Sequence, residues 1–219
     1  MTLSPTERST VRRNAKRSRT DRSDLHAILD SGLVCHLGMT VDGAPRVLPT
    51  GYGRSGDTLY LHGSSGARNL REGGEGVAIC VAVTHLDGIV YARSLMHHSI
   101  NYRSAVIHGS ARAVSSPEEK WEGLRVISEQ LAPGSWEHSR QPDRKELAAT
   151  AVIALDLSEA SVKVRAGGPG DDAADIAAND AWAGVLPLHR SWAAPIPSDD
   201  LPAGFAVPEH IARREHPGT

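Results

Sequence analysis

Two neighbouring segments combine arginine, glycine and serine at a spacing that could bind a phosphorylated ligand with a flat ring. Residues 46–52 read Arg-Val-Leu-Pro-Thr-Gly-Tyr and are predicted to form a strand. Its apolar side chains can pack against one face of the ring, and its backbone groups can hydrogen-bond the ring's polar edge. Residues 59–68 run from Leu-Tyr-Leu-His into Gly-Ser-Ser-Gly-Ala-Arg, where glycines permit close backbone approach and serine hydroxyls suit a phosphate. Arg46 and Arg68 would add bidentate charge. The alternative interpretation is a Ser/Gly hairpin loop between two solvent-facing arginines.

Three histidines stand where imidazole chemistry is conceivable. His62 ends the strand in the second segment, and an imidazole beside a reacting ring can donate or accept a proton near neutral pH. The alternative for His62 is a polar strand-end side chain without a role. His97 and His98 are adjacent, and neighbours on an extended segment point opposite ways, so the pair cannot face one metal ion together. No further ligands stand at zinc-finger spacing.

A short basic strand, residues 161–165, reads Ser-Val-Lys-Val-Arg and leads into a glycine turn. Lysine and arginine on an exposed edge strand discourage pairing with another chain, which is one interpretation of this segment. A binding role for Lys163 or Arg165 is the other. The sequence contains no Ser-His-Asp order, no P-loop and no Gly-x-Gly-x-x-Gly fingerprint.

The composition is that of a globular protein and excludes several partner classes. Of 219 residues, 40% are hydrophobic and 23% charged, and the net charge of −2 indicates neither nucleic acid nor an anionic membrane as a partner. Aromatic residues make up 4%, too few for a surface that stacks nucleic-acid bases. Cys35 and Cys80 lie in apolar runs and are predicted to be small buried thiols. Without an apolar leader or a run near 18 apolar residues, we expect a cytoplasmic protein.

Hydrophobic periodicity predicts the elements that must position these residues. A helix is expected over residues 21–31, a short one over 67–72, and one from a capping box at Ser116 to Pro133-Gly134. A further short helix is expected over 143–149. Residues 51–56 are predicted as a loop, Asp87-Gly88 as a turn, and 77–84 as a strand buried on both faces. The predicted strands cover residues 33–39, 45–50, 58–62, 77–84, 89–93, 102–114 and 150–157.

Short strands at this spacing predict a mainly β protein with peripheral helices (α+β), built on a closed or nearly closed barrel of six or more antiparallel strands. We expect a basic N-terminal arm over residues 1–20, solvated or loosely docked, because it carries six cations and little acid. The barrel domain should span 21–165. A Gly- and Pro-rich C-terminal extension over 166–219 should pack on the barrel or on a partner subunit.

The order and spacing of these motifs resemble the pyridoxamine 5′-phosphate oxidase-like, FMN-binding split-barrel superfamily. Residues 46–51 occupy the place of its first FMN motif, Leu61-His62 the place of its second, and 66–68 the place of its Ser-Arg-Lys helix start. Ser104 stands where the family has a flavin-contacting glutamine. The pattern of residues 97–104, the Asp-Gly-x-Pro hairpin and the Leu-Tyr-Leu-His-Gly-Ser strand end are most similar to the nitroimidazole-reductase-like, flavin-nucleotide-binding branch.

The resemblance implies an FMN-binding split β-barrel that works as a homodimer, with the flavin between the subunits and Lys163 or Arg165 reaching the partner's flavin. It implies an oxidoreductase that passes electrons from NAD(P)H to a small planar acceptor, nitroaromatic or quinone-like, with His62 beside the reacting ring. Some split-barrel relatives bind haem instead of or alongside flavin, which makes His62, His97 and His98 candidate haem ligands. The implied cofactor site consists of Arg46, Val47, Leu48, Pro49, Thr50, Leu61, His62, Ser64, Ser65, Arg68, Ser104 and Lys163.

The sequence also departs from the family pattern. Gly51 stands in place of a lysine and Ala67 in place of a phosphate-binding arginine, so two positive charges are missing. The C-terminal substrate motif of the true oxidases is absent, and oxidation of pyridoxamine phosphate is therefore not expected. A non-catalytic flavin carrier is the remaining alternative function.

Overall fold

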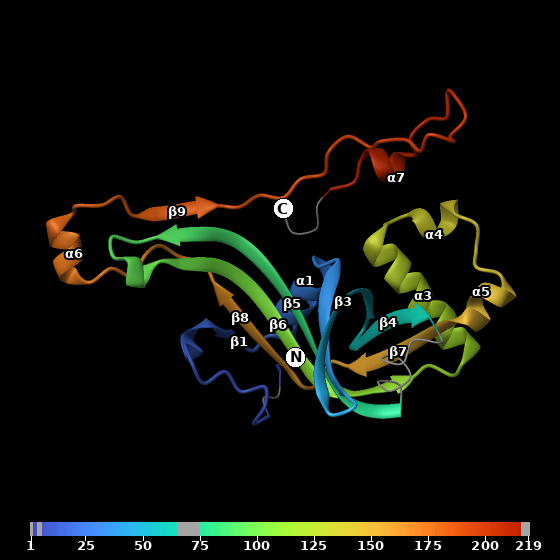
Figure 1. The fold of residues 1–219 in the computed structure, drawn as a ribbon, viewed down its shortest axis with the longest axis horizontal. Helices are drawn as coiled ribbons and strands as arrows, with labels where there is room; N and C mark the ends of the chain where they lie inside the picture. Colours follow the sequence, from blue (N-terminus) through green and yellow to red (C-terminus); the bar gives the residue numbers. More distant parts are fainter. Residues whose placement is uncertain (1, 4–5, 65–74, 216–219) are drawn as a thin grey trace.

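The computed structural model describes residues 2–3, 6–64 and 75–215, and in this part of the chain nine antiparallel strands form one sheet (Figure 1). Six helices and two short 3-10 helices surround it. The strands are β1 (Ser18–Arg19), β2 (Val34–Val41), β3 (Ala44–Ser55), β4 (Thr58–Ser64), β5 (Glu75–Tyr91), β6 (Ser99–Ala113), β7 (Thr150–Asp156), β8 (Ala160–Arg165) and β9 (Gly184–Pro187). The helices are η1 (Ala15–Arg17), α1 (Arg22–Asp30), η2 (Leu95–His97), α3 (Pro117–Leu131), α4 (Ser135–His138), α5 (Arg144–Ala149), α6 (Ala173–Ala178) and α7 (Glu209–Ala212).

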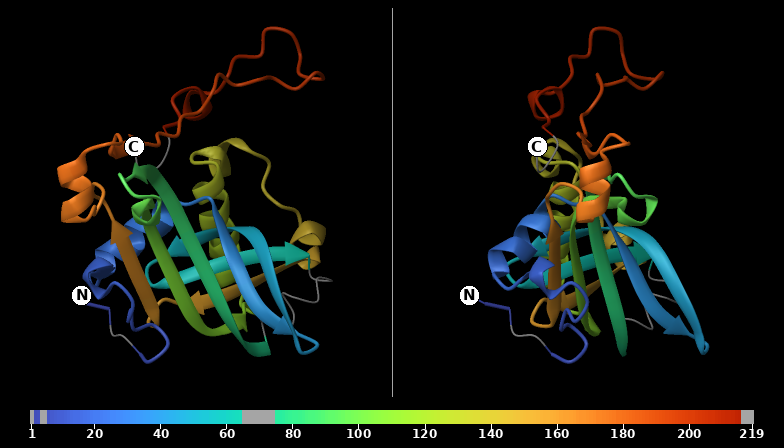
Figure 2. Two further views of the ribbon diagram at one scale, coloured as in Figure 1. Left: turned by 60° about the vertical axis from the view of Figure 1, so that its left-hand side comes forward. Right: turned by 90° about the vertical axis from the view of Figure 1, so that its left-hand side faces the viewer.

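The sheet closes on itself. Its strand order is β1-β8-β6-β7-β4-β3-β2-β5-β9, and an additional pairing of β5 with β6 joins the two sides into a ring of six strands. Strands β1 and β8 flank this ring on one side and β9 flanks it on the other (Figures 1 and 2). The predicted fold, a mainly β barrel with peripheral helices and at least six antiparallel strands, is confirmed.

Three local predictions were wrong. Residues 51–55, predicted as a loop, continue β3, because Tyr52 lies in the barrel core and donates its hydroxyl to the Leu29 carbonyl at 2.6 Å. The predicted turn at Asp87-Gly88 is a register shift inside β5, where Gly88 pairs with β9. Residues 78–84 of β5 are not buried on both faces, since the small side chains between the core positions are half-buried or exposed.

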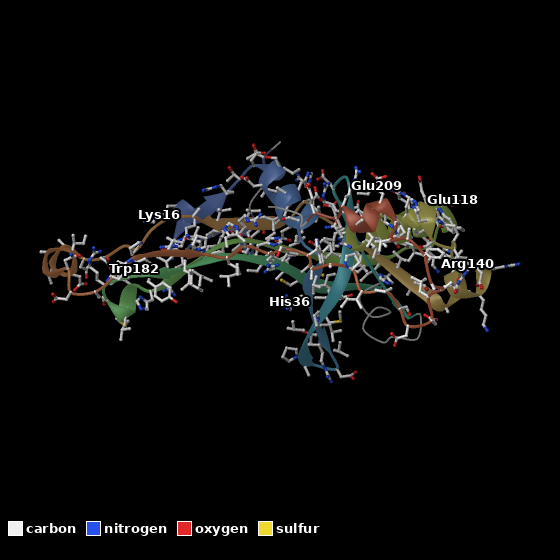
Figure 3. All side chains as sticks on the ribbon, turned by 90° about the horizontal axis from the view of Figure 1, so that it is seen from above. Lys16, His36, Glu118, Arg140, Trp182 and Glu209 are labelled. Atoms are coloured by element: carbon white, nitrogen blue, oxygen red, sulfur yellow. The ribbon has the colours of Figure 1, made fainter. Side chains whose placement is uncertain are left out.

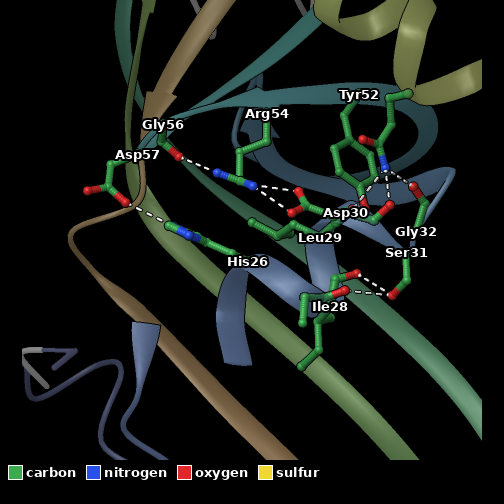
Figure 4. Close-up of polar contacts among 12 residues, drawn as sticks. His26, Ile28, Leu29, Asp30, Ser31, Gly32, Tyr52, Arg54, Gly56 and Asp57 are labelled. Carbon is green, nitrogen blue, oxygen red and sulfur yellow. Dashed lines mark hydrogen bonds and ion pairs between the residues drawn. The ribbon is translucent and has the colours of Figure 1, made fainter. Parts of the chain in front are cut away.

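The barrel core is built from alternate residues of the strands and from the apolar side of α1. Asp21 caps α1 by accepting a hydrogen bond from the Ser23 amide, and the helix buries Leu25, Ile28 and Leu29 against the strands. An Arg54–Asp30 ion pair and the Tyr52 hydroxyl tie β3 to the end of this helix (Figure 4). Cys35 is buried as predicted, and Cys80 is half-buried.

Helix α3 packs on the outside of the barrel over β3 and β4. Ser116 caps it through the Glu119 amide and Pro117 occupies the first turn, as the sequence predicts. The helix lies so close to the barrel that a Cβ on Gly53 would stand 2.5 Å from the Val126 carbonyl carbon. Around this contact a second cluster forms from Tyr60, Val114, Val126, Ile127, Val152 and Ala154.

The two terminal segments differ in packing. The N-terminal arm is docked at Leu3, which is 5% exposed and belongs to the core, and at Arg8, which pairs with Glu159. After β9 the chain runs without helix or strand to α7 (Figure 2). This segment exposes Ile196 and Phe205. The domain boundaries at 20 and 165 remain predictions. Among the described residues, no helix combines the length and the apolarity that crossing a bilayer requires.

Candidate functional site

The outer face of the sheet formed by β3, β2, β5, β6 and β8 carries several of the predicted site residues. Along β2 the side chains alternate, so Cys35 and Leu37 point into the core while Val34 and His36 are exposed. In Figure 3, His36 lies on the side of the sheet opposite to α1. Val34 is 52% exposed and Val47, on the same face of β3, is 65% exposed. This face therefore offers apolar surface that the rest of the described chain does not cover.

The strand register places a row of residues across this outer face. Val34 is paired with Gly51 of β3. Continuing the β2–β5 register by two residues brings Val34 beside Thr84, which is paired with Ser104. The row ends with Lys163 of β8, opposite Ser104, and Ser18 of β1, opposite Lys163. We call this set the outer-face row: Gly51, Val34, Thr84, Ser104, Lys163 and Ser18.

The outer-face row is longer than one flavin ring. Neighbouring strands lie about 4.8 Å apart, so Gly51 and Lys163, separated by four strand spacings, are about 19 Å apart along the sheet. His62 extends the row one strand further, because the register that pairs Tyr52 with Leu61 places it beside Gly51. A single tricyclic ring bound near His62 cannot also contact Lys163 of the same chain.

The predicted residues of β3 and β4 divide between the faces. Val47 and Pro49 lie on the outer face, Leu48 is opposite the core residue Leu37, and Leu61 is fully buried in the barrel. Leu61 can therefore meet a ligand only through its backbone. Arg46 is exposed near the hairpin tip, and Thr50 is half-buried opposite Cys35. The Ser64 side chain, Ser65, Arg68 and the predicted helix over 67–72 lie outside the described residues.

His62 faces a cavity of about 480 Å³ between β4, the start of β7 and helices α3 to α5. The volume is within the range of cofactor sites. Partial desolvation lowers the pKa of His62, although the side chain is exposed to solvent. No described residue makes a hydrogen bond or an ion pair with this imidazole. The cavity is lined by His62, Leu124, Ser128, Leu131, Ala132, Ser135, Trp136, Ser139, Arg140, Gln141, Pro142, Glu146 and Thr150.

One cation lies in the cavity wall. Arg140 pairs with Glu146 at 2.6 Å, and this hydrogen bond, followed by one from the Asp143 amide, lowers the pKa of Glu146 to about 2. Glu146 is thus held at the wall by the α5 capping box as well as by Arg140. Because Arg140 is exposed and long, it can exchange Glu146 for the carboxylate of a ligand.

His97 and His98 lie away from this cavity, at the tip of the β5–β6 ribbon. His98 accepts a hydrogen bond at Nδ1 from the Ala92 amide at 2.9 Å, so its neutral ring carries the proton on Nε2 and cannot offer Nε2 to a metal. His97 directs Nε2 toward Asp172 at 3.4 Å. The described residues contain no group of three or more His, Cys, Asp or Glu side chains that could hold a metal ion.

Sequence reasoning missed the helical wall of the cavity. Leu124 and Leu131 fit the ordinary apolar face of an amphipathic helix, and α4, which carries Trp136, was not predicted. Trp121 and Trp136 meet edge to face at 5.2 Å between ring centroids, which fixes α4 against α3. That contact joins two helices separated by a Pro-Gly turn, so no local sequence pattern predicts it.

Comparison with solved structures finds two proteins similar along nearly the whole chain. The flavocytochrome Anf3 from Azotobacter vinelandii is 39% identical, with a TM-score of 0.89, over 95% of this chain and 97% of that one. The FAD and haem binding protein from Mycobacterium smegmatis is 38% identical, with a TM-score of 0.85, over 89% of this chain and 95% of that one. No match was found among curated proteins.

A more distant structure shows the fold alone. A Bacteroides thetaiotaomicron protein whose name refers to 5-nitroimidazole antibiotic resistance is 21% identical, with a TM-score of 0.57, over 67% of this chain and 86% of that one. The family model described as pyridoxamine 5′-phosphate oxidase matches residues 21–164, which include every strand of the closed ring. The chain therefore belongs to the pyridoxamine 5′-phosphate oxidase family.

Proposed function

We propose that this protein is a redox protein that binds a flavin nucleotide on its outer face and haem in the α3–α5 cavity, with His62 as the haem ligand. The observation that carries the proposal is the position of His62, an imidazole with no described partner at the wall of a largely apolar cavity. The names of the two relatives at 38–39% identity, a flavocytochrome and a protein that binds FAD and haem, support this pairing of cofactors.

The cavity residues fit haem chemically. Desolvation lowers the pKa of His62 and so favours the neutral ring, which has a nitrogen lone pair for a metal. Leu124, Leu131 and Trp136 supply apolar wall for a macrocycle, and Arg140 supplies a cation for its carboxylates. When bound, haem would contribute one-electron chemistry, which the protein would tune through the ligating side chain and the polarity of the pocket. His98 does not fit this role, since its Nδ1 is occupied by the Ala92 amide.

The outer face fits a flavin ring. Val47 and Pro49 present apolar surface. Gly51, between these residues and His62, has no side chain, so its backbone is accessible to a ligand. Ser104 and Thr84 add hydroxyls further along the face. FMN was the flavin implied by the family resemblance, and the name of the Mycobacterium relative favours FAD. A bound flavin would supply the exchange between two-electron donors and one-electron acceptors.

We further propose a homodimer in which two outer faces meet. The exposed Val34 and Val47 would be buried by the contact. The dimer would also explain how Gly51 and Lys163, about 19 Å apart along the sheet, can belong to one kind of flavin site, because Lys163 of one subunit would contact the flavin bound by the other. In this arrangement the protein's own groups orient the ring and exclude water. The electron donor would be a reduced nicotinamide and the acceptor a small planar molecule such as a quinone or a nitroaromatic compound.

A titration of the cofactor-free protein with haemin tests the proposal. The wild-type protein should develop a Soret band that saturates at one haem per chain, and His62→Ala should lose that band. His98→Ala is the matched control, because it removes an imidazole that the Ala92 amide already occupies. A Soret band that survives in His62→Ala and disappears in His98→Ala would overturn the assignment. NADH or NADPH oxidation by the doubly loaded protein, with a quinone present and absent, tests the reaction separately.

A further inference from the structure

Three cations gather at the β8 end of the outer-face row. Lys163 is opposite Ser18 on one side and Ser104 on the other, and Arg165 follows two residues further along β8, opposite Tyr102. Arg17 directly precedes Ser18 and is close enough to Arg165 for their charges to interact. We call Arg17, Lys163 and Arg165 the β8 cation cluster; all three are half-buried.

The β8 cation cluster has no anionic partner within the described residues. Arg165 is held by neutral acceptors, the Asn101 side chain and the carbonyls of Gly167 at 3.1 Å and Gly168 at 2.9 Å. Burial, and after it the charge of Arg17, lowers the pKa of Arg165. The local environment thus disfavours the positive charge of Arg165.

Most other half-buried arginines of the described residues are paired with carboxylates, whereas Arg214 lies over the Trp192 ring. Arg54 is paired with Asp30, Arg93 with Asp171 and Arg103 with Asp87, each by at least two hydrogen bonds. An unpaired cluster of like charges is costly unless an anion neutralises it. The contrast therefore points to a ligand that brings negative charge to the β8 cation cluster.

We infer that the β8 cation cluster binds the second phosphate of FAD, the one that FMN lacks, and thereby makes the protein selective for FAD. This inference rests on the proposed flavin site. The family resemblance assigns the phosphate of FMN to the segment after β4, beside His62. The cluster is about 24 Å from His62 along the sheet, five strand spacings away, so it cannot serve that same phosphate within one chain.

The cluster also has the donors that a phosphate requires. Lysine and arginine give charge-assisted hydrogen bonds, and the hydroxyls of Ser18 and Ser104 flank Lys163 on both sides. In the proposed dimer the cluster of one subunit faces the FAD whose ring the other subunit holds. The adenosine half of that nucleotide would then lie beside Tyr102, whose ring stands opposite Arg165.

Calorimetric titration of the cofactor-free protein with FAD and, separately, with FMN tests the inference. Arg17→Gln and Lys163→Gln should each weaken FAD binding about tenfold, as expected for the loss of one charge-assisted contact, and leave the Kd of FMN unchanged. Arg19→Gln is the matched control. It removes the same charge from β1, but Arg19 is opposite the core residue Val162 and not opposite Lys163, so the substitution should change neither Kd.

Each other outcome has a defined meaning. Equal weakening of FAD and FMN, or no weakening of either, would overturn the inference while the flavin site itself stands. A wild-type protein that binds neither nucleotide would contradict the flavin site and, with it, the inference. Thermal unfolding of the cofactor-free variants, expected to match the wild type, establishes that a lost affinity reflects the missing charge.

Discussion

Alanine at Gly53 should force α3 away from the barrel and so destabilise the protein. The new Cβ would lie 2.5 Å from Ile127 N and from the Val126 carbonyl carbon and 2.6 Å from the Val126 oxygen, all backbone atoms. Ordinary contact begins near 3.4 Å, so the helix must shift by about 0.9 Å, and a backbone cannot rotate aside as a side chain can. Overpacking of this kind costs about 1–3 kcal/mol, and the helical obstacle places Gly53→Ala at the upper end, about 2–3 kcal/mol.

Thermal unfolding of the cofactor-free protein measures this cost. For a domain of this size, 2–3 kcal/mol corresponds to a fall in Tm of about 5–10 °C. Gly51→Ala is the control, two residues earlier in the same strand, because its Cβ would meet nothing nearer than the Leu33 carbonyl oxygen at 4.0 Å. We expect Gly51→Ala to keep or slightly raise the Tm, since glycine in a strand carries an entropic cost. Equal Tm values for the two variants would refute the close approach of α3 to β3.

Three further changes test the core and the cavity. Tyr52→Phe removes the hydroxyl that donates to the Leu29 carbonyl at 2.6 Å, and should lower the free energy of unfolding in urea by about 1 kcal/mol; an unchanged value would show that this bond adds nothing to stability. Burial lowers the pKa of His85, so as the pH falls the unfolded chain binds a proton before the folded chain does. The free energy of unfolding should therefore be at its full value above about pH 6.5 and decline below it. His85→Gln should flatten that decline in urea titrations at successive pH values, and an identical decline would exclude His85 as its source. Arg140→Gln should weaken the binding of haem about tenfold and leave the binding of its dimethyl ester unchanged, because Arg140 is the cation of the cavity wall; equal effects on both ligands would contradict a carboxylate contact.

Much of the barrel was predictable from local pattern. The alternation of apolar and polar residues along 33–39 and 102–114 predicts strands with one buried face. The capping box at Ser116 predicts the start of α3. The errors at residues 51–55 and at Asp87-Gly88 share one cause, since glycine suggests a turn when the sequence is read locally. In the folded chain the absence of a side chain at Gly53 allows α3 to pack closely on β3. Gly88 likewise allows β9 to approach β5, where a Cβ on Gly88 would stand 2.8 Å from the Leu186 carbonyl oxygen. Both approaches join distant segments.

The candidate site was predictable only in part, for the same reason. Alternation along β6 and β8 places Ser104 and Lys163 on outward positions, and the register makes them direct neighbours. The distance between these two residues and His62 follows from the strand order, in which β5 and β2 stand between β6 and β3. The cavity at His62 depends on the packing of α4 and α5 against α3, and the sequence pattern of these short helices carries no information about that contact.

The cofactor content of the purified protein tests the central claim most directly. The protein should be coloured, and denaturation should release one flavin and one haem per chain, with FAD as the flavin. His62→Ala, purified in the same way, should retain the flavin and lose the haem. A colourless wild-type protein that takes up neither cofactor on addition, or a His62→Ala protein that keeps its full haem content, would contradict the account.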